Sequence, residues 1–252
     1  MARGVQLKIE GFIVHLQRAT ARRRQVDHLL KELPVETRVV EAVDGQALSD
    51  TQIAERYAKG LHKPSYPFEL RKSEVACFLS HRKVWRTIVE SDLDAGLIVE
   101  DDVALDVALF RRCFEVAKTV CAGKAYLQFQ TRPVKGAFRT VVRTDGVDVL
   151  SPEVTQLRTS AQLVSREAAR ALLSISERFD RPVDTFLQMR WLTDIVPLCV
   201  VPSGVSDCTQ QTGGSTIQGG KSPWQRVSRE YHRFVYRRAV RHLSLTAAKS
   251  DG

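Results

Sequence analysis

The feature that most constrains the fold is the run Gly96–Val103, in which an apolar stretch is followed at once by Glu100, Asp101 and Asp102. A short apolar run bounded by polar residues is typical of a buried strand. In α/β sheets, ligands bind just beyond the carboxyl ends of the strands, which is where these acids fall. Adjacent carboxylates repel one another, so such a cluster is favoured when a divalent cation or dense hydrogen bonding offsets the repulsion.

The spacing within the cluster predicts which acids act together. Successive side chains of an extended segment point to opposite sides, so Glu100 and Asp102 should point the same way while Asp101 faces elsewhere. Carboxylate oxygens suit Mg²⁺ or Mn²⁺, and we expect Glu100 and Asp102 to share one such ion. The alternative is a solvated acidic turn that closes the strand.

Strand-like and helix-like segments alternate along the chain, which favours an α/β fold with a mostly parallel central sheet. Strands are predicted over 7–16, 37–43, 96–99, 125–129, 147–150 and 195–201, and helices over 20–33, 73–91 and 166–174. The face of the first helix that we expect to be buried contains Val26, Leu29, Leu30 and Leu33. A main domain over 1–220 and a basic tail over 221–252 are predicted, with a glycine-rich linker at 213–220.

Composition restricts the class of protein. With 43% hydrophobic and 27% charged residues among 252, the chain is typical of a globular protein. Its five cysteines include no Cys-x-x-Cys pair, which argues against a disulfide framework and a structural zinc site. We expect no signal peptide and no membrane span, because no apolar run is long enough. A reducing cytoplasm is therefore the expected location.

The net charge of +9 is concentrated in residues 221–252, which hold eight Lys and Arg against two acids. Helical periodicity divides this tail into an aromatic face with Trp224, Val227, Tyr231, Phe234 and Val235, and an arginine face with Arg226, Arg229, Arg233 and Arg237. We expect residues 221–245 to contact an anionic membrane surface or a partner protein. The alternative is a helix packed on the main domain. No nucleic-acid-binding module is recognisable, so nucleic acid is not an expected partner.

Several motifs, in order, resemble those of one enzyme family. They are Ile13–Arg18, Arg22–Arg23, Glu41–Gly45, Glu74–His81 and Leu97–Asp102, followed by Ala161–Leu173, Pro182–Asp184 and Ser215–Ile217. Together they resemble glycosyltransferase family 25, which includes bacterial lipooligosaccharide β-galactosyltransferases and collagen galactosyltransferases. An ordered set of motifs is more specific than any one of them.

The resemblance implies a glycosyltransferase A-like (Rossmann-like) domain that binds a nucleotide sugar. It implies transfer of galactose or a similar hexose from a UDP-sugar, with inversion and with Mn²⁺ or Mg²⁺, to a hydroxyl of a glycan or glycolipid. Lipopolysaccharide or lipooligosaccharide is the expected acceptor, which favours the inner face of the membrane. The chain departs from the family at His15, where Asn is usual, at Ala76, where Gly is usual, and at Arg158–Gln162, where Gly-Thr-x-Ala-Tyr is common.

Residues that follow the first two predicted strands are the candidates for binding the donor. Leu16, Gln17, Arg18 and Arg22 lie at the start of a helix, where backbone N–H groups and guanidinium groups favour phosphate. Asp44 is placed to accept from ribose or uracil. The alternatives are a solvated helix face for the arginines at 22–24 and a turn-forming Asp-Gly for Asp44.

The acidic run and a histidine complete the predicted donor site. Asp102, with Glu100 and Asp101 assisting, would hold a metal that neutralises charge on the departing UDP. His81 is expected to contact the donor or groups beside the metal; the alternative is a hydrogen-bonded structural histidine.

Inverting transfer also needs a base that takes the proton of the acceptor hydroxyl. Asp184 is the candidate, because Pro182 fixes the approach of the chain and the next turn is predicted to be helical. The alternative role for Asp184 is a helix N-cap.

Other functions compete with transfer. A catalytically silent nucleotide-sugar-binding protein would bind UDP without turnover, and a metal-dependent phosphodiesterase could use the acidic cluster and a basic surface. The chain has no Walker loop, no Gly-x-Gly-x-x-Gly after a strand and no nucleophile elbow. Kinase, dinucleotide-enzyme and serine-hydrolase functions are therefore not supported.

Overall fold

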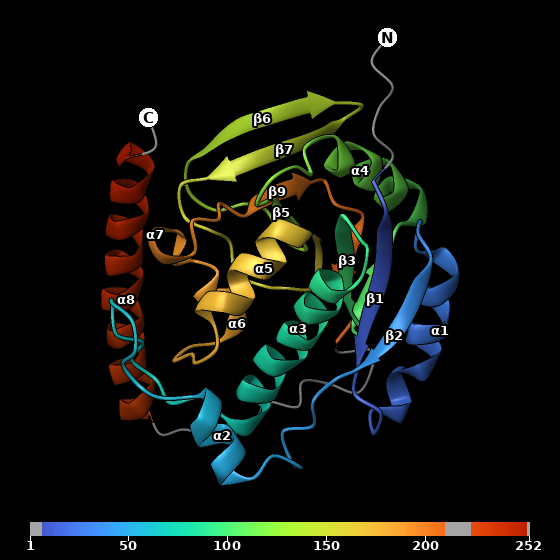
Figure 1. Cartoon of the computed structure of the whole chain (residues 1–252). Helices are drawn as coiled ribbons and strands as arrows, with labels where there is room; N and C mark the ends of the chain where they lie inside the picture. Colours follow the sequence, from blue (N-terminus) through green and yellow to red (C-terminus); the bar gives the residue numbers. More distant parts are fainter. Residues whose placement is uncertain (1–6, 210–222, 251–252) are drawn as a thin grey trace.

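The computed structural model describes residues 7–209 and 223–250 and is built around one large sheet (Figure 1). Its eight strands have the order β2-β1-β3-β8-β5-β9-β7-β6, and a small second sheet pairs β10 with β4. The strands are β1 (Ile9–His15), β2 (Thr37–Glu41), β3 (Ala95–Glu100), β4 (Val103–Leu105), β5 (Tyr126–Phe129), β6 (Phe138–Thr144), β7 (Val147–Pro152), β8 (Ala161–Ser165), β9 (Leu198–Val201) and β10 (Val205–Asp207). The predicted α/β class is confirmed.

Helices cover both faces of the sheet (Figure 1). They are α1 (Arg23–Glu32), which follows a short 3₁₀ turn (Thr20–Arg22), α2 (Asp50–Arg56), α3 (Lys72–Glu90), α4 (Val107–Thr119), α5 (Arg166–Ile175), α6 (Val183–Phe186), α7 (Arg190–Thr193) and α8 (Pro223–Ser250). α1 and α4 pack on one face, and α3, α5 and α6 pack on the other. Among the described helices, none combines the length and the apolar content that crossing a bilayer requires.

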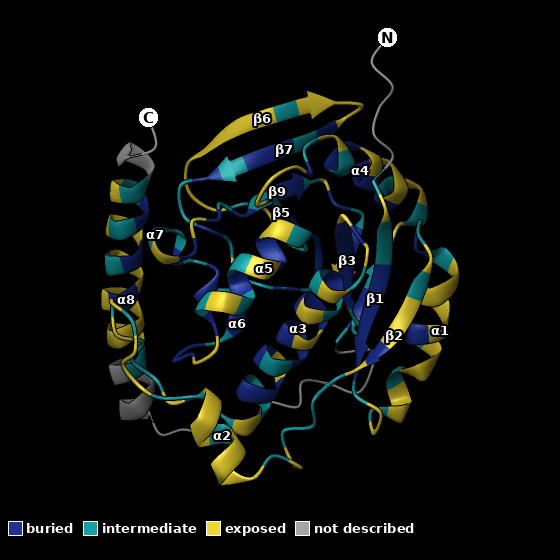
Figure 2. Cartoon of the chain, viewed as in Figure 1, coloured by how far each residue is buried: buried dark blue, intermediate teal, exposed yellow. Residues whose placement is uncertain are grey.

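Side chains of the central strands alternate between two hydrophobic cores, one on each face of the sheet. Phe12 and Ile98 point to the core shared with α3 and α5, whereas Ile13 and Leu97 point to the core shared with α1 and α4. Figure 2 shows β1 and β3 as largely buried. Burial on both faces explains why these strands appear in the sequence as continuous apolar runs.

The prediction of a mostly parallel sheet is wrong in one respect, because the sheet is mixed. β1 is parallel to β2 and β3, and β5 is parallel to β9, but β8 is antiparallel to both β3 and β5, and β7 to both β6 and β9. A strand buried on both faces has the same apolar pattern in either direction, so the sequence carried no signal for the reversal. Because β8 is reversed, its first residue, Ala161, pairs with Val99 near the end of β3.

Most of the predicted strands and helices are confirmed with small shifts of their ends. Leu30 is an exception on the predicted buried face of α1, because it is 36% exposed and lines a cavity. The edge strand β6 was not predicted. It is almost wholly exposed and so lacks the apolar alternation that marks a half-buried strand (Figure 2).

The C-terminal helix α8 packs on the domain with one face and leaves the opposite face open. Its buried side chains include Tyr236, Val240 and Ser244, while Tyr231, Phe234 and Val235 are 65%, 61% and 48% exposed. Arg229 and Arg233, predicted on a separate arginine face, lie over the ring of Phe68. The helix therefore packs on the main domain, as the alternative has it, while contact of its exposed face with a membrane or a partner stays a prediction. The predicted linker at 213–220 and the boundary at 220 lie outside the described residues.

Candidate active site

The acidic run lies where the sequence predicts, at the carboxyl end of β3. Glu100 is the last residue of β3, a turn holds Asp101 and Asp102, and β4 begins at Val103. β10 pairs with β4, and the backbone N–H of Cys208 donates to the carbonyl oxygen of Asp102 at 2.9 Å. This pairing brings a late segment of the chain to the acidic turn.

Glu100 is held by residues from two other elements. Its Oε1 accepts a hydrogen bond from Thr159 Oγ1 at 2.7 Å and lies 3.3 Å from Nε2 of His81 on α3. Thr159 reaches Glu100 because β8 is antiparallel, which puts the residues before its start at this end of the sheet. Burial raises the pKa of Glu100, but the His81 and Thr159 contacts outweigh burial and leave the pKa below its usual value.

Asp101 faces the loop after β1 rather than Glu100. Its Oδ2 lies 2.7 Å from His15 Nδ1, and its Oδ1 accepts from Arg22 Nη1 at 2.6 Å. Arg22 also lies 3.3 Å from Oδ2 of Asp102. The side chains of Asp101 and Arg22 are only 7% and 15% exposed, so a solvated acidic turn and, for Arg22, a solvated helix face are both excluded.

Asp102 is the acid whose charge is least compensated. Burial, together with the charges of Glu100 and Asp101, raises the pKa of Asp102 to about 6, against the opposing effects of Arg22 and of a 3.2 Å hydrogen bond from Thr209. An ionised carboxylate in such surroundings is stabilised by a divalent cation. The carboxylate oxygens of Asp102 and Glu100, which together carry an uncompensated negative charge, therefore fit Mn²⁺ or Mg²⁺ as metal ligands.

The loops after β1 and β2 hold the remaining predicted donor residues. Arg18 Nε donates to Asp44 Oδ2 at 2.8 Å, and Asp44 Oδ1 accepts from the backbone N–H of Gln46 at 2.9 Å, so Asp44 forms both an ion pair and the predicted turn. Gly45 is required there, because a Cβ would come within 2.7 Å of the Lys72 carbonyl oxygen. Leu16 accepts from Ala19 N in a turn, which leads the chain toward α1.

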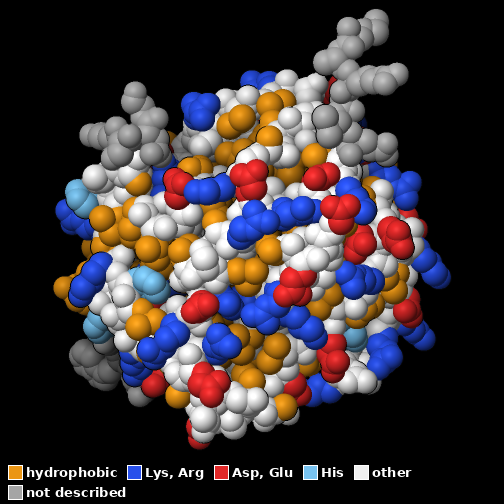
Figure 3. All heavy atoms as spheres, viewed as in Figure 1, with side chains coloured by type: hydrophobic (Ala, Val, Ile, Leu, Met, Phe, Trp, Pro, Cys, Tyr) orange, Lys and Arg blue, Asp and Glu red, His pale blue; other side chains and the backbone are white. Residues whose placement is uncertain are grey.

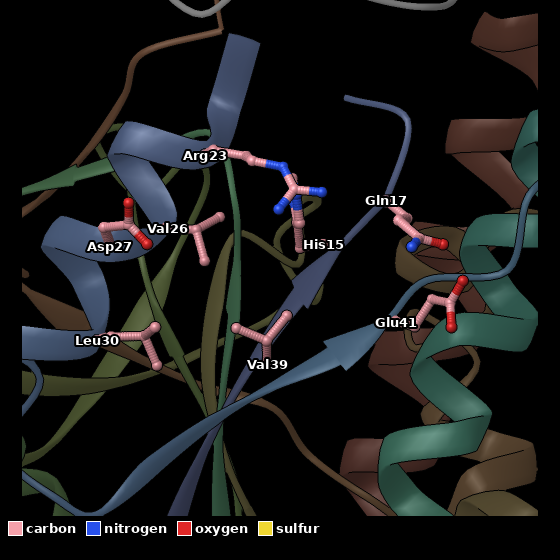
Figure 4. Close-up of a pocket in the computed structure, with 8 residues that line it drawn as sticks. All are labelled: His15, Gln17, Arg23, Val26, Asp27, Leu30, Val39 and Glu41. Carbon is pink, nitrogen blue, oxygen red and sulfur yellow. The ribbon is translucent and has the colours of Figure 1, made fainter. Parts of the chain in front are cut away.

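A cavity of about 360 Å³ lies beside these loops, between α1 and the edge strand β2 (Figure 4). Val26 and Leu30 of α1 face Val39 of β2 across it, and Gln17 lies at its rim. His15 lines the cavity and also contacts Asp101, and its buried Nε2 has no hydrogen-bond partner within the described part of the chain. A ligand in this cavity can therefore extend toward the acidic turn. The volume lies in the range of small-molecule sites.

Asp184 lies in the first turn of α6, and the N-cap of that helix is Pro182, so the N-cap role for Asp184 is excluded. Its carboxylate accepts from Thr185 Oγ1 at 3.1 Å and from the backbone N–H of Arg158 at 3.3 Å. Burial raises the pKa of Asp184, and the charge of Glu100 adds to the rise, against the opposing hydrogen bonds. Adjacent residues therefore link the two carboxylates, since Arg158 binds Asp184 and Thr159 binds Glu100.

Arg158 has a φ of +83°, a left-handed conformation that favours glycine. The Arg158 guanidinium donates to Asp207 Oδ2 at 2.6 Å. The sequence indicates the segment that contains Thr159 but predicts no role for Thr159. Asp207 and Thr209 could not be predicted as neighbours of the acidic turn, because only the pairing of β10 with β4 brings them there.

Cys77 is a further residue of this region that the sequence did not single out as a ligand. It lies one turn before His81 on α3 and is exposed. Ligand atoms of Cys77, His81 and Glu100 lie within 4.8 Å of one another. Desolvation within the site, followed by the charges of Glu100 and Asp184, raises the pKa of the Cys77 thiol, which favours its neutral form.

The model of glycosyltransferase family 25 (LPS biosynthesis protein) matches residues 8–187, which include the acidic turn and Asp184. The chain belongs to glycosyltransferase family 25. This membership agrees with the motifs at β1, α3 and β3 that form the site.

Among curated relatives in family 25, procollagen galactosyltransferase 1 of Danio rerio is 29% identical over 72% of this chain and 31% of its own length. The probable inactive glycosyltransferase 25 family member 3 of Rattus norvegicus is 31% identical over 71% of this chain and 32% of its own length. The chain thus spans about a third of the length of these relatives. A crystal structure of galactosyltransferase LgtC with donor and acceptor sugar analogs matches 75% of this chain and 72% of that chain, with a TM-score of 0.38 and 10% identity.

Proposed function

We propose that this chain is a metal-dependent inverting glycosyltransferase that moves a hexose, most simply galactose, from a UDP-sugar to a hydroxyl of a glycan. The observation that carries the proposal is the link between the two acidic groups, in which neighbouring residues Arg158 and Thr159 hold Asp184 and Glu100. A carboxylate beside a metal-binding acidic turn is the arrangement that leaving-group stabilisation and base catalysis require together. Membership of family 25 and the galactosyltransferase relatives support the choice of galactose.

Asp102, with Glu100 assisting, would hold Mn²⁺ or Mg²⁺, and the bound ion supplies positive charge for the diphosphate of the donor. Arg22 is fixed by Asp101 and Asp102 and adds a guanidinium at the same end of the sheet. His15 lines the cavity beside these groups, and its buried Nε2 has no hydrogen-bond partner among the described residues. These groups bind and orient the donor diphosphate.

Asp184 takes the proton of the acceptor hydroxyl as the new bond forms. The hydrogen bonds from Arg158 N–H and Thr185 hold the carboxylate in place, and its raised pKa brings its basicity closer to working pH. For the acceptor we propose a lipopolysaccharide, a lipooligosaccharide or another surface glycan, in agreement with the description of the family model. The relatives named as procollagen galactosyltransferases make hydroxyl-bearing protein the competing acceptor class.

The test of the donor and the metal is thermal unfolding with UDP-galactose, UDP-glucose and UDP-N-acetylhexosamines, each with and without Mn²⁺. At 100 times its Kd a ligand stabilises the fold by about 2.7 kcal/mol, or roughly 5–10 °C for a chain of this size. We expect a Mn²⁺-dependent shift with one UDP-sugar. Asp102→Asn should lose the shift, yet melt higher than the wild type without ligand at neutral pH, because it removes an ionised carboxylate whose pKa is raised to about 6.

Each other outcome has a definite meaning. Stabilisation by a UDP-sugar without turnover on any acceptor would identify a binding protein, as the name of the rat relative suggests for that protein. No shift with any of these UDP-sugars would overturn the proposal of a UDP-sugar-dependent transferase. Hydrolysis of a phosphodiester without sugar transfer would favour the phosphodiesterase alternative.

We further propose that α8 docks the protein on an anionic membrane surface, at the cytoplasmic face. Tyr231, Phe234 and Val235 form an exposed apolar strip, and Arg238 and Arg241 are exposed on the same side of the helix. Figure 3 shows hydrophobic side chains interleaved with basic and histidine side chains along the edge where α8 lies. Such a helix binds by apolar insertion and by attraction to anionic lipids. The five free cysteines fit a reducing compartment.

Sedimentation with phosphatidylglycerol-containing vesicles tests this docking. Deleting α8 would confuse docking with folding, because the helix also packs on the domain through Tyr236. The double change Tyr231→Ser and Phe234→Ser should lower vesicle binding by at least about tenfold, since each buried aromatic contributes about 1.5–3 kcal/mol. Phe138→Ser, which alters an exposed phenylalanine on β6, is the control and should bind as the wild type does. Equal binding by both variants would refute the docking role of α8.

A further inference from the structure

A mixed sulfur, nitrogen and oxygen cluster of Cys77, His81 and Glu100 lies at the acidic turn, and the proposed transfer uses only Glu100 of the three. Cys77 and His81 are four residues apart on α3, so their side chains share one face of that helix. Glu100 meets them from the end of β3, and one ligand atom from each of the three lies within 4.8 Å of the others. Asp102 is not a member of this group.

The spacing fits a tetrahedral ion. Zinc bonds of about 2.0–2.3 Å to nitrogen, oxygen and sulfur place neighbouring ligand atoms roughly 3.3–3.6 Å apart. His81 Nε2 and Glu100 Oε1 are 3.3 Å apart, which matches this separation and is long for a hydrogen bond. The ligand atoms of the three residues are at most 4.8 Å apart, about 1 Å more than zinc ligands require. Rotation of the Cys77 side chain can bring its sulfur closer by that amount.

The surroundings have further properties of a metal site. His81 is buried, which fixes its ring, and Thr159 Oγ1 donates to Glu100 Oε1 at 2.7 Å, which orients the carboxylate. Cys77 is exposed, so an ion can reach the cluster from solvent and water can fill a fourth position. A thiolate and an imidazole select a softer ion than Mn²⁺ or Mg²⁺, which prefer oxygen.

We propose that Cys77, His81 and Glu100 form a second metal site, selective for Zn²⁺ or a similar thiophilic divalent ion and separate from the position held by Asp102. On binding, the Cys77 thiol loses its proton to solvent and the thiolate sulfur becomes a ligand. Because Glu100 also belongs to the proposed donor site, Zn²⁺ at this cluster removes Glu100 from that site. Zinc is then an inhibitor of transfer, a consequence that rests on the proposed function, whereas the binding of zinc does not.

Titration of the metal-free protein with Co²⁺, without any nucleotide sugar, tests the binding directly. A thiolate bound to Co²⁺ gives a charge-transfer band in the near ultraviolet, and Zn²⁺ should abolish that band by displacement. We expect the band in the wild type and in Asp102→Asn, and its loss in Cys77→Ser. Cys121→Ser, which alters a buried cysteine in the core on the other face of the sheet, is the matched control and should keep the band.

A wild type without the band, or a band that persists in Cys77→Ser, would overturn the proposal whether or not the chain transfers sugar. His81→Ala should weaken Co²⁺ binding. It should keep part of the melting shift that a UDP-sugar and Mn²⁺ produce, whereas Asp102→Asn should lose that shift. Where transfer is measured, Zn²⁺ should inhibit the wild type at about tenfold or more lower concentration than Cys77→Ser. Equal inhibition of the two would place the inhibitory zinc elsewhere.

Discussion

Asp184→Asn is expected to lower the rate of sugar transfer by about 10²- to 10⁴-fold, the usual contribution of a general base. The amide keeps the shape of the carboxylate: its oxygen can still accept from Arg158 N–H, and its NH2 group can donate to the Thr185 hydroxyl, so the fold and the donor site should be unchanged. What is lost is the basic oxygen that takes the acceptor proton. Steady-state rates with saturating donor and Mn²⁺ measure the loss, and the melting shift with the donor shows that binding remains.

The pH dependence gives a second, independent reading of the same role. A base works only when deprotonated, so the wild-type rate should fall as pH drops through the pKa of Asp184, which burial raises above its usual value near 3.8. The variant should lack that acid limb. Glu74→Gln is the control, because it removes the charge of a carboxylate on α3 instead of α6 and keeps an acceptor for Arg71 N–H. It should leave the rate nearly unchanged. Turnover of Asp184→Asn within tenfold of the wild type would remove Asp184 as the base.

Arg181→Met is expected to destabilise the fold by about 3–5 kcal/mol, the effect of removing one partner of a buried ion pair. Arg181 is fully buried, and its guanidinium donates to Asp180 Oδ1 at 2.7 Å, to Tyr236 Oη at 2.8 Å and to the carbonyl oxygen of Pro64 at 3.0 Å. Without it, Asp180 is left as a buried carboxylate with only His62 as partner among the described residues. Urea unfolding at neutral pH measures the loss.

Two comparisons separate the charge from the packing. Tyr236→Phe removes a single hydrogen bond to a charged group and should cost about 1.5–3 kcal/mol. Burial raises the pKa of Asp180, but Arg181 and His62 outweigh burial and hold it below its usual value. The stability gained from the pair is therefore present above that usual range and is lost as pH falls, so the gap between wild type and Arg181→Met should narrow in acid. A loss under about 1 kcal/mol at neutral pH would show that the pair is not needed.

The sequence predicted the elements whose periodicity is strong and the acids that follow an apolar run. Leu97 and Ile98 are buried in the two different cores, so β3 is apolar throughout and could be predicted as a buried strand. Glu100 could then be predicted at the carboxyl end of that strand. The direction of β8 could not be predicted, because a strand buried on both faces reads alike both ways. Thr159 therefore had no predicted partner, although it holds Glu100.

Contacts between distant segments account for the rest of the difference. Asp207 and Arg158 meet because β10 pairs with β4, and nothing in either local sequence indicates that pairing. In α8 the periodicity showed an aromatic strip but not which side the domain would cover. The face with Tyr236 packs on the domain, because the Tyr236 hydroxyl accepts a hydrogen bond from the guanidinium of Arg181. The face with Phe234 remains exposed.

The contact between Arg181 and Tyr236 also sets an order of events during synthesis. The two residues are 55 positions apart in the chain. At about 5–20 residues per second, a ribosome adds Tyr236 roughly 3–11 s after Arg181. During that interval the nascent chain holds the guanidinium, three residues before Asp184, without the phenol that later covers it. The contacts of Arg181, beside Asp184, are therefore completed only after the Tyr236 part of α8 has been made.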